Sequence, residues 1–150
     1  MTVKLTPERV AWLRRMTLGF VFLWFFLGSF AHFIFARAEA GIIPEYFPFH
    51  VLAVYISGIC EMLGALAILW QRTRRIAGLG LVLLTIAVTP ANVHMALHWQ
   101  NYPGVPAWLL NARLVFQVFF LVAIAWSTSA LQLLQGGSIS GSSDQKSRES

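Results

Sequence analysis

Six polar side chains that could bind a ligand or exchange a proton lie within otherwise apolar stretches of this 150-residue chain. These side chains belong to His32, Glu61, Asn92, His94, Arg113 and Gln117. Ionisable groups at membrane depth are functional candidates by default, because burying them in hydrocarbon is costly. Together the six predict a ligand-binding site. Glu61 is its candidate catalytic residue, since a carboxyl group can both donate and accept a proton.

The two charged members of this set, Glu61 and Arg113, raise a question of charge balance. A carboxylate near the middle of a membrane is costly unless it is protonated or paired. Arg113 is the only cation expected within reach, and it would have to fold back toward Glu61, because helical side chains lean toward the N-terminus of their helix. The sequence leaves both alternatives open, a Glu61–Arg113 pair or a protonated Glu61. A third interpretation is that the polar residues only hold the helices together.

The composition indicates where these residues are placed. The chain is 57% hydrophobic and 11% charged, with a mean hydropathy of +0.66, whereas a soluble domain has about 25% charged residues. An aromatic content of 14% excludes a disordered chain. We therefore expect a small integral membrane protein. Its one cysteine, Cys60, excludes an internal disulfide or a CxxC motif, and we expect it to be buried beside Glu61.

Four stretches approach the ~20 apolar residues needed to cross a bilayer. They cover residues 16–36, 50–70, 76–97 and 107–126. Short connections between them predict an all-α fold, an integral membrane antiparallel four-helix bundle. This transmembrane domain, residues 14–128, follows an N-terminal segment, 1–13, in which Thr6 and Pro7 indicate the start of an interfacial helix. The tail, 129–150, is rich in Gly and Ser from about residue 136 and should be disordered there.

The basic residues are distributed unequally around the predicted spans. Nine lie on one side, namely Lys4, Arg9, Arg14, Arg15, Arg72, Arg74, Arg75, Lys146 and Arg148, and only Arg37 lies on the other. The positive-inside rule then places both termini in the cytoplasm, and we expect a bacterial inner membrane. These short flanking clusters explain the net charge of +5 without nucleic acid.

Aromatic residues lie at the same predicted boundaries, as in the belts that anchor spans at the headgroup level. Trp12, Trp70 and Trp126 fall at the inner boundary, and Tyr46, Trp99, Tyr102 and Trp108 fall at the outer one.

The depth of each polar residue follows from the helical rise of about 1.5 Å per residue. His32, Asn92, His94 and Arg113 lie roughly 5–9 Å from the outer surface, and Glu61 and Gln117 roughly 15–16 Å. All six thus occupy the outer half of the bundle, which predicts an outward-facing polar pocket above an apolar inner half. Small residues spaced around Glu61, namely Ser57, Gly58, Gly64 and Ala65, predict close approach of another helix. Pro90 predicts a kink, near which Asn92 would satisfy free backbone groups.

Several blocks of this sequence resemble the DoxX-like family of membrane proteins over about residues 14–128. The blocks are Gly28 with His32-Phe33, Ile43-Pro44, Phe47-Pro48, residues 56–64 (ISGICEMLG), residues 72–75 (RTRR), residues 90–97 (PANVHMAL), Arg113-Leu114, Gln117 and Ala125-Trp126. The resemblance implies a four-helix membrane bundle. It also implies a redox context, because the wider family is associated with quinone-linked oxidation of sulfur compounds and with complexes of other oxidoreductases.

Three functions remain open, and the sequence leaves undecided whether the chain is itself an enzyme. The first is an accessory or assembly subunit of a membrane redox system, with a redox protein as partner and possible oligomers. The second is an oxidoreductase subunit that binds a quinone or another small ligand through Glu61 and Arg113. The third is a metal site formed by His94 and His98 with His32 or Glu61, or a haem held by His32 and His94.

Overall fold

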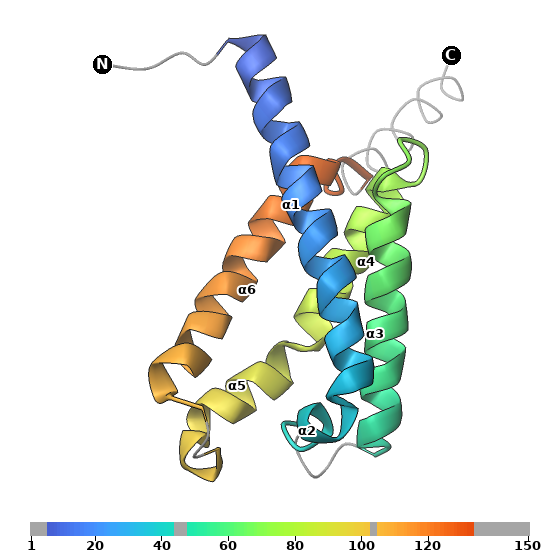
Figure 1. Cartoon of the computed structure of the whole chain (residues 1–150). Coiled ribbons are helices and arrows are strands. Elements are labelled where there is room, and N and C mark those ends of the chain that lie inside the picture. Colours follow the sequence, from blue (N-terminus) through green and yellow to red (C-terminus); the bar gives the residue numbers. More distant parts are fainter. Residues whose placement is uncertain (1–5, 44–47, 103–104, 134–150) are drawn as a thin grey trace, which may run out of the picture.

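A computed structural model describes residues 6–43, 48–102 and 105–133, and the regular structure in these residues is entirely helical (Figure 1). The helices are α1 Pro7–Ile34, α2 Ala36–Ala40, α3 His50–Ala67, α4 Arg74–Ala87, α5 Thr89–Leu97, the 3₁₀ helix η1 Trp99–Asn101, and α6 Ala107–Thr128. The predicted all-α class is confirmed for these residues. The tail predicted to be disordered from 136 lies outside them, as do Lys4, Tyr46, Lys146 and Arg148.

Four helical segments are long and apolar enough to cross a membrane: Pro7–Ile34, His50–Ala67, Arg74–Leu97 and Ala107–Thr128. Most of their apolar side chains point away from the protein interior. Leu63 is 61% exposed and Val115 is 71% exposed, for example. So large an exposed apolar surface is expected to contact lipid. The four predicted spans therefore all correspond to helices suited to a multi-pass membrane protein.

The first helix is longer than predicted. It begins at Pro7, with Thr6 at the N-cap position, and continues without interruption to Ile34. The helix start at Thr6 and Pro7 was predicted correctly, but the expected separate interfacial helix is instead the first part of α1. The reason is that residues 8–17 contain no glycine or proline, and most are good helix formers.

The third span is broken in two, as Pro90 predicts. Helix α4 ends at Ala87 and α5 begins at Thr89, with the proline at its start. Helix α4 packs against both α3 and α6, whereas α5 packs mainly against α6. The break thus lets α5 lean toward α6 and away from α3 (Figure 1).

One end of the bundle, which we call the arginine end, contains the N-terminal part of α1, the start of α4 and the end of α6. Arginines there bind backbone carbonyls at the ends of helices. Arg14 Nε donates to the Ser127 carbonyl at 3.0 Å, and Arg74 Nε donates to the Ile68 carbonyl at 2.9 Å. A cation at the C-terminal end of a helix also interacts favourably with the helix dipole.

An apolar core fills the bundle on the side of the arginine end. Its buried members are Val21, Phe25, Ala65, Ile68, Leu81, Phe120, Ala123 and Ile124. Glycines permit the close packing around it: a Cβ added at Gly64 would lie 2.6 Å from Leu81 Cδ2. The opposite end, which we call the α2 end, is held by the hydroxyl of Tyr102, which donates to the Gly41 carbonyl at 3.0 Å.

Candidate functional site

A cavity of about 640 Å³ lies between the helices toward the α2 end, and we call it the α2-end cavity. Residues from α1, α2, α3, α4, α5 and α6 all line it. Its polar lining consists of His32, Glu39, Ser57, Glu61, Thr85, Asn92, Arg113 and Gln117. Five of the six predicted site residues therefore lie in one cavity. The sixth, His94, does not line it.

Aromatic and aliphatic side chains form the remaining walls, among them Trp24, Phe25, Val54, Leu109, Phe116 and Phe120. Phe25 and Phe120 belong to the apolar core as well as to the cavity wall. The core therefore closes the cavity on the side of the arginine end. An apolar chamber with a few converging polar groups is typical of small-molecule binding sites.

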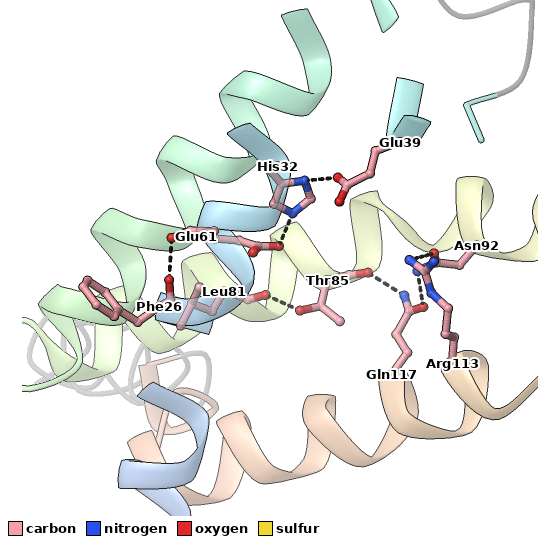
Figure 2. A network of polar contacts seen from close by, with 10 residues as sticks. Phe26, His32, Glu39, Glu61, Leu81, Thr85, Asn92, Arg113 and Gln117 are labelled. Carbon is pink, nitrogen blue, oxygen red and sulfur yellow. Dashed lines mark hydrogen bonds and ion pairs between the residues drawn. The ribbon is translucent and has the colours of Figure 1, made fainter. Parts of the chain in front are cut away.

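On one side of the cavity, His32 lies between two carboxyl groups (Figure 2). Its Nε2 is 3.2 Å from Glu61 Oε1 on α3. Its Nδ1 is 2.5 Å from Glu39 Oε2 on α2, an ion-pair contact without the alignment of a good hydrogen bond. We call these three residues the carboxylate–histidine array. The array therefore brings two carboxyl groups to one imidazole on this side of the cavity.

The partner of Glu61 in this array is His32, and no contact between Glu61 and Arg113 occurs among the described residues. The Glu61–Arg113 alternative is therefore wrong for this structure. Two local features explain the pairing. The Glu61 side chain leans toward the N-terminus of α3, which is the direction of the α2 end. The arginine, by contrast, is engaged by neutral residues of α5.

Glycines allow α1 and α3 to approach closely enough for this contact. A Cβ added at Gly58 would lie 2.7 Å from His32 Cβ and 3.2 Å from the Ser29 carbonyl oxygen, too close for any side chain. A Cβ at Gly28 would lie 3.6 Å from Glu61 Oε2. The predicted close approach of a neighbouring helix at the small residues of α3 is thus confirmed.

On the other side of the cavity, amide and guanidinium groups form a chain of hydrogen bonds between α4, α5 and α6 (Figure 2). Arg113 Nη2 donates to Asn92 Oδ1 at 3.1 Å, and Asn92 Nδ2 donates to Gln117 Oε1 at 2.8 Å. Gln117 Nε2 donates to the Thr85 carbonyl at 2.7 Å and to the Thr89 hydroxyl. The role expected of Asn92, satisfying backbone near the kink, therefore falls to Gln117, whose longer side chain crosses from α6.

Arg113 has only neutral partners among the described residues, namely Asn92 and the sulfur of Met95. No carboxylate in these residues lies within 4 Å of its guanidinium group. The cavity therefore has acidic groups on the α1–α3 side and a guanidinium group on the α6 side. A ligand between them would meet a hydrogen-bond acceptor at one end and a donor at the other.

The residues of the metal and haem alternatives do not all meet at one place, because His94 does not line the cavity that holds His32 and Glu61. His94 and His98 rings lie 4.3 Å apart, but His98 Nδ1 contacts the His94 carbonyl at 2.9 Å. No group of three or more His, Cys, Asp or Glu residues in the described ranges could hold a metal ion. His94 also lies outside the cavity lined by His32, so nothing in the described structure supports their joint binding of haem. Cys60, which we expected to be buried, is exposed.

Glu39 and Thr85 line the cavity but were not among the predicted site residues. Glu39 follows the first predicted span, so its hydropathy suggested a connecting loop. The spacing could nevertheless have indicated its role. His32 and Glu39 are seven residues apart, and residues at that spacing lie on the same face when the chain continues as a helix in the same direction. Ser57, noted only for its small size, has a buried hydroxyl without a partner among the described residues.

The chain matches the sequence model of a family described as a domain of unknown function (DUF8561) over residues 21–129. This range includes every polar residue of the α2-end cavity. Neither the curated proteins nor the solved structures contain a match to the chain.

Proposed function

The chain belongs to the DUF8561 family, and we propose that it binds a small, largely apolar molecule with hydrogen-bonding groups in the α2-end cavity. One observation carries the proposal. The cavity joins apolar walls to the carboxylate–histidine array on one side and to the Arg113 guanidinium group on the other. Structural polar residues alone would pack against each other and leave no chamber of about 640 Å³ between them.

In this proposal the protein is an antiparallel four-helix bundle in a bacterial inner membrane, with both termini in the cytoplasm. The antiparallel order is supported by the contacts of α1 with α3, in which Gly28 lies near Glu61 and Gly58 near His32. The orientation is supported by the arginine end, since positively charged flanks stay in the cytoplasm. The α2-end cavity then belongs to the outer half of the membrane.

The ligand class that this site fits best is a quinone or a similar flat ring with oxygen atoms at opposite edges. Arg113 would donate to one oxygen, and the carboxylate–histidine array would exchange a proton at the other. Trp24, Phe116 and Phe120 would provide apolar walls for the ring. The Ser57 hydroxyl, which has no partner among the described residues, could bind such a ligand and so recover the cost of its burial.

The resemblance to DoxX-like proteins supports a redox context for this binding. The protein would then be the quinone-binding part of a membrane redox system, or an accessory subunit that uses the cavity to recognise a bound molecule. Both versions predict an occupied cavity. An assembly subunit without a ligand would instead be recovered with a stoichiometric partner protein and an empty cavity.

Quinone binding is measurable through Trp24, because quinones quench tryptophan fluorescence and this ring lines the cavity. We expect saturable quenching of the protein in lipid nanodiscs titrated with decyl-ubiquinone, and loss of that component in Trp24→Phe. The Glu61→Gln variant should bind the probe at least tenfold more weakly, since a hydrogen bond to a charged group contributes about 1.5–3 kcal/mol. His98→Gln, altered outside the cavity, should bind like wild type.

Non-saturable quenching, or quenching unchanged in Trp24→Phe, would show that the quinone enters the lipid and not the cavity. Wild-type affinity in Glu61→Gln would contradict the role assigned to the carboxyl group. Mass spectrometry of the protein purified in mild detergent tests binding without a chosen probe. A molecule that co-purifies with the wild type should be lost from the Glu61→Gln variant and retained in His98→Gln.

A further inference from the structure

We propose that Glu39, His32 and Glu61 form a proton path that connects the α2-end cavity with the water at the α2 end only. The role of this path rests on the proposed function, because the path would supply or remove a proton at the bound ligand. Its existence is independent of the ligand, because it depends on three side chains and on the core behind them.

The exposure of the three side chains falls in the order that such a path needs. Glu39 on α2 is 25% exposed, His32 is 21% exposed, and Glu61 is 13% exposed. Contacts of 2.5 Å and 3.2 Å join them in the same order. Both distances lie within reach of proton transfer without an intervening water molecule. Transfer from Glu39 also needs its carboxyl group to turn into line with His32 Nδ1, because this contact is close but not aligned as a hydrogen bond.

The transfer steps balance through the two nitrogens of the imidazole. A proton passes from the Glu39 carboxyl to His32 Nδ1 while the proton on Nε2 passes to Glu61 Oε1. Glu39 regains its proton from water, and Glu61 delivers its proton to a basic oxygen of the ligand. The neutral imidazole left with hydrogen on Nδ1 is reset when the ring turns over, so that Nδ1 gives its proton to Glu61 and Nε2 takes the next one from Glu39. Without that rotation the two steps can only run in reverse.

The direction of the path follows from the apolar core. Beyond Glu61, toward the arginine end, lies the apolar core cluster, and Phe25 and Phe120 form its boundary with the cavity. The buried hydroxyl groups at that end, of Ser127 and Thr128, both donate to the Ile124 carbonyl of their own helix. Residues 76–84 of α4 carry no ionisable group. Glu61 therefore has a chain of polar neighbours toward the α2 end and hydrocarbon toward the other.

Few other charged groups face the array. Arg113 on α6 is the one further ionisable side chain in the described cavity lining. Helix α4 contributes the neutral Thr85 to the same lining. The second ionisable residue of α2, Arg37, is exposed and does not line the cavity, and neither does Tyr55 of α3. Proton exchange at Glu61 is thus governed by His32 and Glu39, with Arg113 across the cavity.

Time-resolved infrared spectroscopy of the carboxyl band tests this proposal in lipid vesicles with a strongly buffered lumen. The Glu61 band is identified by its loss in Glu61→Gln. The orientation of the protein is established by labelling Arg37→Cys, made in a Cys60→Ser background, with an impermeant maleimide. When the α2 end faces outward, a jump in external pH should change the Glu61 band at once. In the opposite orientation the band should follow only the luminal pH.

Two variants examine the residues of the path. His32→Phe and the nearly isosteric Glu39→Gln should each slow the response of Glu61 at least tenfold, whereas His98→Phe should respond like wild type. Equal rates in all variants would overturn the proposal, because protons would then reach Glu61 through cavity water alone. A response to the pH at the arginine end would overturn its direction. These outcomes need no quinone, so they remain distinct from a failure of decyl-ubiquinone binding.

Discussion

Replacing Gly58 by alanine should separate α1 from α3 at the contact on which the candidate site depends. The new Cβ would lie 2.7 Å from His32 Cβ, whereas carbon atoms in contact are about 3.5–4.0 Å apart. The two helices must therefore move apart locally by about 1 Å. The same movement would lengthen the 3.2 Å contact between His32 Nε2 and Glu61 Oε1 to about 4 Å, the limit of an ion pair.

The energetic effect is best measured against a second glycine. Overpacking of this kind costs about 1–3 kcal/mol, and it is opposed by a gain of about 1 kcal/mol because alanine favours the helix. A Cβ at Gly80 on α4 would meet no atom within 4 Å, so Gly80→Ala should show that gain alone. We therefore expect the free energy of unfolding to be about 1–3 kcal/mol lower in Gly58→Ala than in Gly80→Ala.

Reversible unfolding in mixed micelles, followed by circular dichroism, measures this difference. The infrared band of Glu61 should also change in Gly58→Ala and stay unchanged in Gly80→Ala. Equal stability of the two variants, with an unaltered carboxyl band, would refute the close approach of α1 and α3 and the array built on it.

Three further predictions concern the rest of the bundle. Gln117→Leu should lower the free energy of unfolding by about 1–3 kcal/mol, because the Thr85 carbonyl and Asn92 lose a buried partner, and equal stability to wild type would contradict the hydrogen-bond chain. Arg74→Gln should lower it by about 0.3–1 kcal/mol through the lost helix-end interaction, whereas Arg75→Gln should not, because Arg75 makes no such bond with any residue that the structure describes. A reporter enzyme active only outside the cytoplasm should be active when inserted after Gly41 and inactive at the C-terminus. The reverse pattern would invert the proposed orientation.

The sequence predicted well the helices and the gathering of polar residues at one end of the bundle, because both depend on distance along the chain. A span is recognised from its length and hydropathy, and a residue's depth follows from the rise per residue. His32, Glu61, Asn92, Arg113 and Gln117 line the same cavity for that reason. The break before α5 could also be predicted from the sequence, since proline removes a backbone donor wherever it occurs.

The direction in which each side chain points was predicted less well. In a membrane helix, residues facing lipid and residues facing the core are equally apolar, so hydropathy does not show how the helix is rotated. Cys60 is exposed and His94 lies outside the cavity for this reason. The pairing of Glu61 with His32 depends on the space left by Gly58, and the contribution of Glu39 depends on the course of the chain after α1.

The apolar core beneath the cavity has an electrical consequence in the membrane orientation proposed above. Hydrocarbon-like packing has a low dielectric constant, so most of the transmembrane voltage would fall across the core and little across the polar cavity. Moving one charge through the full voltage takes about 2.3 kcal/mol per 100 mV, but a proton reaching Glu61 from the α2 end would cross only a small part of it. Proton exchange at the site would then follow the acidity outside the cell and remain nearly insensitive to the membrane potential.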